Sequence, residues 1–320
     1  MDLRIGTSGF QFESWKPAVY PHRLKKSEMF DYYCGRLGFD CLELNATFYH
    51  LPNPKAMETL ARRAPEGFLF IAKLHHGLTH RVVGRLRRQP PASWQELNSL
   101  GRALGPACPT SRGTACRAPT PLLLSRLFYR SIQPLRESGK LDGVLAQFPP
   151  SFLPGEENCD YLRFMKDEAG QLPLFVEFRH RDWTRQATFD FLRREGIGYC
   201  ATDLPRLGSL PQFTPVTTTE GGYFRLHGRS PDWFRDPDQR YRYSYSDREL
   251  SHFLQTARRF ASTLRQHPPA RQKYGGREDN RLLPGADRVY IFFNNCHAGA
   301  AIRNAKRARE MLHATLPVGT

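Results

Sequence analysis

Charged and amide side chains in this chain gather at the carboxyl ends of short apolar segments. The set comprises Thr7, Glu43, Asn45, Lys73, Glu177, Arg179, Asp203, Arg225, His227, Asn294 and Asn295. A strand that is buried on both faces is normally apolar throughout, so polar residues collected at its end need a reason. Residues two apart, such as Glu177 with Arg179, leave a strand on one face. Glu43, Asn45 and Thr47 are expected to alternate in the same way.

General acid–base catalysis is the chemistry that these residue types favour. Cations lower the pKa of a neighbouring carboxyl group and an apolar wall raises it, so Glu43 and Glu177 could take different roles in one site. Glu177 is the predicted general base, because Arg179 can hold an anionic group of the substrate while Glu177 abstracts a proton. His227 is the predicted acid, since the pKa of an unperturbed imidazole lies near neutrality. Arg179 and Arg225 suit a phosphate or carboxylate through forked hydrogen bonds.

The remaining polar strand ends are predicted to bind the substrate around one cavity. This group comprises Thr7, Glu43, Asn45, Lys73, Arg179, Asp203, Arg225, Asn294 and Asn295. Lys73 has two interpretations: a cation for phosphate, or a lysine that forms a Schiff base. Any single member could instead cap a helix, and Glu177 with Arg179 could be a structural ion pair.

A metal centre is a weaker alternative for the same residues. Glu43, Glu177, Asp203 and His227 could offer a carboxylate-rich site to a divalent ion. The sequence lacks the ring of histidines that a trinuclear zinc site needs, so no metal ligand is assigned. Phosphate-loop, dinucleotide, H-E-x-x-H and G-x-S-x-G motifs do not occur, and no cofactor is expected.

The elements that must position these residues alternate between strands and helices. The expected strands span 3–9, 40–48, 67–74, 142–148, 172–178, 197–203, 221–228 and 288–295, and helical apolar spacing occurs at 26–37, 54–64, 189–195 and 247–264. This alternation predicts an α/β fold, a TIM-type (β/α)8 barrel in one domain over 1–320, rather than an open Rossmann-like sheet. The carboxyl ends of all strands then meet at one mouth, where barrel active sites lie.

Two tracts interrupt this alternation. Residues 101–121 are rich in proline, glycine and small polar residues and have no apolar period, which predicts an irregular insertion between the third and fourth strands. Residues 268–287 are predicted to form a loop for the same reason.

Composition limits the possible partners. The chain has 320 residues, 40% of them hydrophobic, and a formal net charge of +16, which favours an anionic small molecule or nucleic acid as partner. It has neither a membrane-length apolar run nor a signal-peptide pattern, so no membrane partner and a cytoplasmic location are expected. The seven cysteines are scattered and form no C-x-x-C pair, so a disulfide framework is not indicated.

Several segments together resemble a known family. They are RIGTSGF, LELNATFYHLP, PEGFLFIAKLHHGLTH, AQFPPSF, VEFRHRDW, ATDLP, YFRLHG and IFFNN followed by AIRNAKRAREML. In order and spacing they resemble the YecE-like family, domain of unknown function 72, over nearly the whole chain. The resemblance implies a TIM-type barrel without a settled activity. Likeness to apurinic endonuclease and sugar isomerase barrels exists only at the level of the fold. The tract 101–121 departs from the family pattern.

These observations leave two hypotheses about function. The first is an enzyme of the hydrolase or lyase class that acts by acid–base chemistry on a phosphorylated or nucleic-acid-like substrate. The second is a non-catalytic nucleic-acid-binding protein. Aromatic residues near the expected mouth, among them Trp15, Phe48, Tyr49, Trp233 and Phe234, could stack on bases or simply close the barrel.

Overall fold

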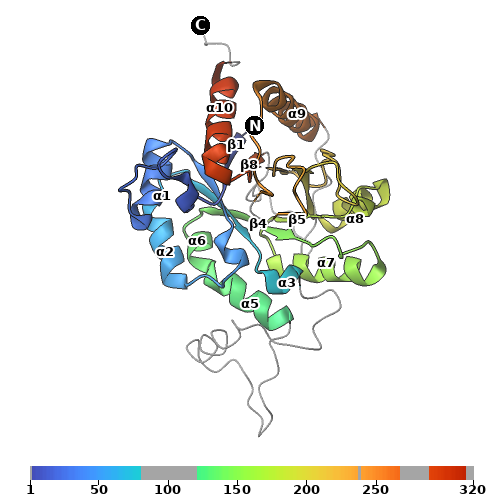
Figure 1. Cartoon of the computed structure of the whole chain (residues 1–320). Helices are drawn as coiled ribbons and strands as arrows, with labels where there is room; N and C mark the ends of the chain where they lie inside the picture. The colour runs from blue at the N-terminus through green and yellow to red at the C-terminus, as the bar shows by residue number, and fades with distance from the viewer. Residues whose placement is uncertain (1, 81–120, 237–238, 267–287, 315–320) are drawn as a thin grey trace, which may run out of the picture.

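Eight parallel strands close into a barrel in chain order. The computed structural model describes residues 2–80, 121–236, 239–266 and 288–314. The strands are Asp2–Ser8 (β1), Cys41–Leu44 (β2), Leu69–Lys73 (β3), Leu141–Gln147 (β4), Leu174–Glu177 (β5), Gly198–Asp203 (β6), Gly222–Leu226 (β7) and Arg288–Phe293 (β8). Each strand pairs in parallel with the next, and β1 pairs with β8 to complete the ring (Figure 1). The predicted TIM-type barrel is confirmed.

Helices surround the strands. The longer ones are Pro54–Arg63 (α2), Pro121–Ser131 (α5), Glu156–Ala169 (α7), Gln186–Glu195 (α8), Asp247–Gln266 (α9) and Ala300–Ala314 (α10). Short ones are Met29–Asp31 (α1), His76–Thr79 (α3) and Gln133–Glu137 (α6), with single turns at Glu13–Trp15 (η1), Lys26–Glu28 (η2), Tyr32–Arg36 (η3), Ala46–Phe48 (η4), Arg181–Trp183 (η5) and His297–Gly299 (η6). The helices expected at 54–64 and 247–264 are confirmed. The one expected at 189–195 begins three residues earlier, at Gln186.

Local sequence signals explain where helices begin and end. Asn53 caps α2 because its side chain accepts a hydrogen bond from the Lys55 amide, and Pro54 stands in the first turn, where a missing N–H does no harm. Helix α8 ends at Glu195, and Gly196 caps it in the left-handed conformation that glycine tolerates best.

Side chains alternate along the strands between the barrel interior and the helices. The interior is filled by Cys41, Leu69, Ile71, Leu145, Phe175, Cys200, Tyr223, Tyr290 and Phe292. The intervening residues, such as Phe70, Val144 and Phe224, belong to the larger core shared with the helices. At the amino-terminal end, Asp142 accepts hydrogen bonds from Tyr290 and Arg288. Polar residues on the inward face at the carboxyl ends therefore lie above a filled interior.

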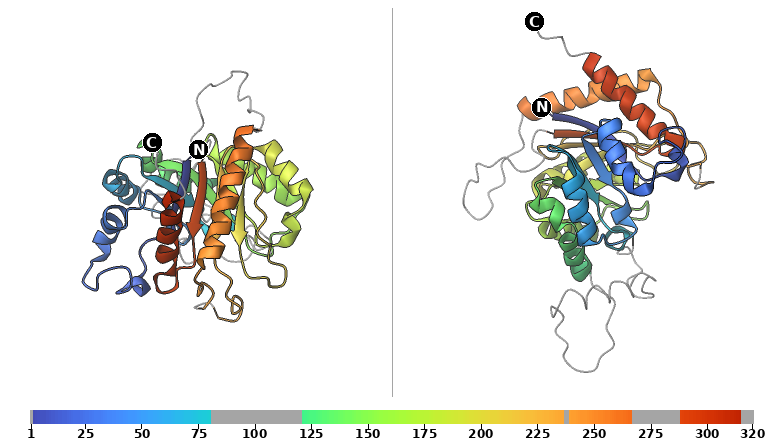
Figure 2. Two further views of the ribbon diagram at one scale, coloured as in Figure 1. Left: turned by 90° about the horizontal axis from the view of Figure 1, so that it is seen from above. Right: turned by 90° about the vertical axis from the view of Figure 1, so that its left-hand side faces the viewer.

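The last two long helices cover the seam where the barrel closes. Helix α10 packs against β1, β8 and α9, so the two ends of the described chain are held together (Figure 2). No helix in the described part of the chain is both long and apolar enough to cross a membrane. The expected insertion at 101–121 lies outside the described residues except for Pro121, where α5 begins. The loop expected at 268–287 also lies outside them.

Candidate functional site

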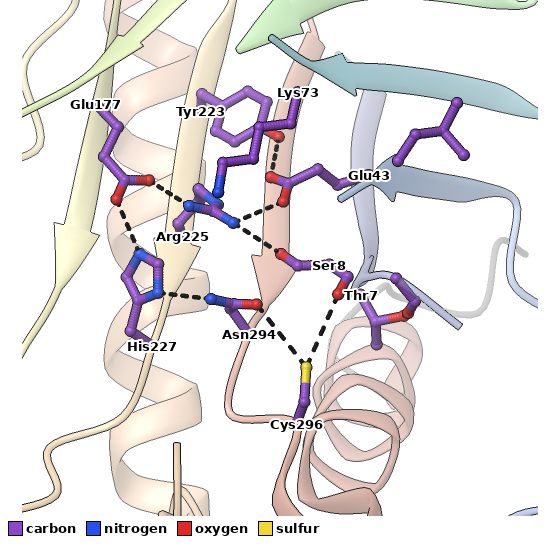
Figure 3. Close-up of polar contacts among 12 residues, drawn as sticks. Thr7, Ser8, Glu43, Lys73, Glu177, Tyr223, Arg225, His227, Asn294 and Cys296 are labelled. Atoms are coloured by element: carbon purple, nitrogen blue, oxygen red, sulfur yellow. Dashed lines mark hydrogen bonds and ion pairs between the residues drawn. The ribbon is translucent and has the colours of Figure 1, made fainter. Parts of the chain in front are cut away.

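Arg225 is the centre of the polar network at the carboxyl ends of the strands. Its guanidinium group donates to Glu177 Oε2 at 2.5 Å and to Glu43 Oε1 at 2.6 Å. All three side chains are fully buried. The Tyr223 hydroxyl donates to the other oxygen of Glu43 at 2.6 Å. Strands β2, β5 and β7 are thereby joined across the barrel (Figure 3).

A second chain of contacts runs from Glu177 along the mouth. Its Oε1 accepts a hydrogen bond from Arg179 Nε at 2.5 Å and lies 3.3 Å from His227 Nε2. The other ring nitrogen of His227, Nδ1, lies 2.8 Å from the Asn294 side-chain nitrogen (Figure 3). The structure therefore brings the two predicted catalytic residues, Glu177 and His227, into direct contact.

The charges in this network fix two protonation states. Burial alone would raise the pKa of Glu177, but Arg179, Arg225 and His227 together hold it well below its usual value. Burial and then Arg179 lower the pKa of His227 to about 3. At neutral pH, Glu177 is consequently ionised and the His227 ring is uncharged.

Lys73 enters the mouth from the end of β3 and has no ionic partner among the residues that the structure describes. Its side chain is 5% exposed and extends toward Arg225 (Figure 3). The amine lies 3.9 Å from the centre of the Phe48 ring. No carboxylate of the described residues lies within 4.0 Å of that amine. Burial and then Arg225 lower the pKa of Lys73 to about 7. The amine is therefore poised to gain or lose a proton near neutrality.

Aromatic residues from the loop after β7 cover one side of the network. The centre of the Trp233 ring lies 5.4 Å from the guanidinium carbon of Arg179 and 5.6 Å from that of Arg240. It lies 5.9 Å from the centre of the His227 ring. Two aromatic side chains near this end remain open to solvent: Tyr49 is 56% exposed and Phe234 is 57% exposed. The mouth thus combines a buried charged centre with an aromatic border.

Three predicted substrate-binding residues face away from the network. Thr7 donates to the carbonyl of Gly9 and contacts the Tyr33 hydroxyl, on the helix side of β1. Asp203 binds Arg229 through both carboxylate oxygens and accepts a hydrogen bond from Tyr245.

Asn295 is the third of these residues. Its side-chain nitrogen donates to the Tyr243 carbonyl and to the Asn304 side chain. These contacts connect the end of β8 with α10 and with the segment before α9. Their geometry is that of structural anchors.

The alternation expected for Glu43, Asn45 and Thr47 stops after Glu43. Strand β2 ends at Leu44, and Asn45 already has helical backbone angles at the start of η4. The Thr47 hydroxyl instead donates to the carbonyls of Leu44 and Lys73. This correction has a simple cause, since a helical turn abolishes the two-residue period of a strand. Asn45 Oδ1 is buried without a hydrogen-bond partner among the described residues.

Sequence reasoning missed several inward-facing residues. Ser8 and Tyr223 contribute hydroxyls to the network around Arg225 and Glu43. Thr202 follows Cys200 by two residues and therefore shares its inward face, opposite Arg225 in the β6–β7 register. Ser8 carries no signal of its inward position in the sequence, because Thr7 beside it is equally polar and only the structure shows that Ile5 and Thr7 share the outward face. Tyr223 also gave no indication of its role, because a tyrosine in a strand is an ordinary core residue.

The proposed metal ligands are not gathered at one point. Among the described residues, no group of three or more histidine, cysteine, aspartate or glutamate side chains is arranged to hold a metal ion. Glu43 and Glu177 both bind Arg225, and Asp203 faces Arg229 outside the network.

The model of a family described as "Protein of unknown function DUF72" matches residues 4–318. The chain belongs to the DUF72 family. This confirms the resemblance drawn from the sequence segments.

One curated relative and two solved DUF72 structures match nearly the whole chain. The UPF0759 protein YunF of Bacillus subtilis is 27% identical over 308 residues, which cover 92% of this chain and 90% of YunF. A DUF72 crystal structure from Thermotoga maritima is 33% identical with a TM-score of 0.74, covering 98% of this chain and 100% of that one. A second, from Enterococcus faecalis, is 21% identical with a TM-score of 0.70, covering 98% and 96%. None of these names states an activity or a substrate.

Proposed function

We propose that this DUF72 protein is an enzyme that performs acid–base chemistry at the mouth of its barrel. Its substrate carries a phosphate or a similar anionic group, as a sugar phosphate or a nucleic-acid fragment does, and the reaction is a hydrolysis or a lysis. The observation that carries the proposal is the buried Lys73 amine, which has no carboxylate partner within the described structure. Burying an unpaired cation is unfavourable, and shifted ionisable groups cluster at functional sites.

The protonation states of Glu177, His227 and Lys73 favour other catalytic roles for these residues than the sequence suggested. Glu177 is stabilised as a carboxylate by Arg179 and Arg225, which makes it a weak base. His227 is neutral at pH 7 and orients its ring between Glu177 and Asn294. Lys73, with its pKa lowered to about 7, is the group best matched to exchange a proton at physiological pH. In this proposal, Glu177 and His227 position the cations and Lys73 carries the proton.

Arg179 supplies the contact for the substrate's anionic group. Its Nε and one terminal nitrogen face Glu177 and His227, whereas no described residue accepts a hydrogen bond from its Nη1. Arg240 contacts the same Trp233 ring as Arg179 and adds a second positive charge at the border. A net charge of +16 for the chain also favours anionic substrates.

Turnover of a defined substrate panel tests this proposal. The panel contains sugar phosphates, nucleotides and abasic oligonucleotides, and products are detected by mass spectrometry. We expect Lys73→Met to reduce turnover by about 10²-fold or more with substrate affinity changed only a few-fold, the range seen for loss of a general acid or base. Lys55→Met, on the exposed face of α2, is the matched control and should leave turnover unchanged. Full turnover by Lys73→Met contradicts the proposal.

A non-catalytic nucleic-acid binder is the competing candidate, favoured by the exposed rings of Tyr49 and Phe234. Such a protein should bind oligonucleotides with an affinity that falls steeply between about 50 and 200 mM salt, because phosphate contacts release condensed counterions. Its affinity should depend on Arg240 and be indifferent to Glu177→Gln. An enzyme should instead lose turnover in Glu177→Gln and retain substrate binding.

A further inference from the structure

The nitrogen of Lys73 differs from the two guanidinium groups of the Arg225 network, because no carboxylate of the described residues pairs with it. Arg225 is bound by two carboxylates, and Arg179 is bound by one of the same pair. Both carboxylates of the network, Glu43 and Glu177, are therefore already occupied by guanidinium groups. The Lys73 amine is left against the Phe48 ring at 3.9 Å, an apolar face that can accept a cation but cannot take its proton.

The surroundings fix the backbone from which this amine extends. The Thr47 hydroxyl donates to the backbone carbonyl of Lys73, and Phe48 follows in the same turn. Arg225 lies below the amine in the network and repels an added positive charge (Figure 3). A lysine desolvated beside another cation is the environment in which amines act as nucleophiles toward carbonyl groups.

We propose that Lys73 forms a Schiff base with an aldehyde or ketone carbon of the substrate. The inference rests on the proposed function, because it uses the same mouth and deepens the role of the same lysine. It narrows the substrate class to small carbonyl compounds that bear an anionic group. Arg179 contacts that group through Nη1, next to the Trp233 ring.

Formation of the Schiff base requires neither an oxidant nor a reductant. The nitrogen lone pair bonds to the carbonyl carbon, and the π electrons of the C=O bond move to oxygen. In the resulting zwitterion, nitrogen passes one of its protons to oxygen, which gives the carbinolamine. The carbinolamine hydroxyl takes up one proton from solvent and leaves as water, and the nitrogen lone pair forms a protonated C=N bond to Lys73. The protonated imine withdraws electrons from the carbon next to the C=N carbon. A C–H or C–C bond of that neighbouring carbon is therefore broken more readily. Water then hydrolyses the imine and restores the amine.

Reductive trapping tests the covalent bond directly. The full-length protein is incubated with glyceraldehyde 3-phosphate and sodium cyanoborohydride, and the modified lysines are identified by peptide mapping. The chain has only nine lysines, so each can be followed. We expect Lys73 to be labelled at least about tenfold faster than exposed lysines such as Lys55 at pH 7.5, because burial and Arg225 lower the pKa of Lys73 to about 7 and leave much of its amine unprotonated. Unphosphorylated glyceraldehyde, the matched probe, should label Lys73 more slowly.

The wild-type peptide map decides the proposal even if substitutions disturb folding. Labelling of Lys73 at the same rate as surface lysines such as Lys55 overturns it, as does equal labelling by the two probes. A second measurement uses Lys73→Arg, which should abolish the fast phase, with Lys55→Arg as its control.

The outcomes also separate this inference from the proposed function. If turnover depends on Lys73 but no adduct is trapped, the Schiff base is wrong and acid–base catalysis stands. If the adduct forms selectively but no member of a carbonyl-containing panel is turned over, the amine is a nucleophile as proposed and the proposed enzymatic function is wrong.

Discussion

Arg225 Nη1 lies 2.5 Å from Glu177 Oε2, and neither side chain is exposed to solvent. The same guanidinium group binds Glu43 from the opposite side of the barrel. One buried cation therefore compensates two buried carboxylates, and the three strands that carry them are held in one arrangement. Such an arrangement is sensitive to the loss of its central member, since the charges that remain have no partner.

Replacement of Arg225 by methionine should destabilise the fold. Two buried carboxylates would lose their shared cation, and removing one partner of a buried ion pair typically costs about 3–5 kcal/mol. The free energy of unfolding, measured by urea denaturation, should fall by an amount in this range. Arg307→Met is the matched control, because Arg307 pairs with Asp247 on the surface, and it should change stability little. Equal effects of the two substitutions would contradict the central role of Arg225.

Lys73 should become reactive at a lower pH than an ordinary lysine. Burial and Arg225 lower its pKa to about 7, so the neutral amine predominates above that pH. Competitive acetylation with a trace of acetic anhydride should show its rate rising between about pH 6 and 8 and then levelling, whereas lysines in water titrate near pH 10.4. The exposed Lys55 provides the internal reference. Parallel pH profiles for the two lysines would refute the lowered pKa.

The barrel could be predicted from the sequence because its signals are repeated. Eight apolar runs alternate with helical segments, and each run ends in polar residues. Once the barrel is assumed, those ends must meet, and Glu43, Lys73, Glu177, Arg225 and His227 do lie in one network. Residue type together with position at a strand end was sufficient to predict that these five residues lie close together.

The inward or outward direction of a side chain was harder to predict. Strands buried on both faces are apolar on both, so hydrophobicity does not reveal which residues point inward. At the end of β6 both Thr202 and Asp203 are polar, and the sequence favoured the charged one, which faces outward to Arg229. At the end of β1 the same uncertainty exists between Thr7 and Ser8. Protonation states could not be predicted from the sequence either, because they depend on neighbours from distant strands. The residues around His227 are an example.

Acid should destabilise the protein partly through His227. Its pKa is lowered to about 3 in the folded chain, and an unfolded histidine has a pKa near 6.5. Between these values the unfolded state binds more protons, so stability rises with pH and is lost as the pH falls from about 6.5 toward 3. The melting temperature of His227→Asn should therefore fall less steeply than that of the wild type over this range. His252→Asn, on the exposed side of α9, is the control and should follow the wild type.

Asp203 and Thr202 should respond to substitution in opposite ways, because neighbouring residues of β6 face opposite sides of the strand. Asp203 accepts hydrogen bonds from Arg229 and Tyr245, so Asp203→Ala should reduce the free energy of unfolding by about 1–3 kcal/mol. The rate of reductive labelling at Lys73 in Asp203→Ala should stay within a few-fold of the wild-type rate, since none of these contacts reaches the network around Arg225. The Thr202 hydroxyl is buried without a partner in the described structure, so Thr202→Val should leave stability unchanged or raise it. Denaturation curves and labelling rates of the two variants check the assignment. Loss of Lys73 labelling in a folded Asp203→Ala protein would show that Asp203 belongs to the site after all.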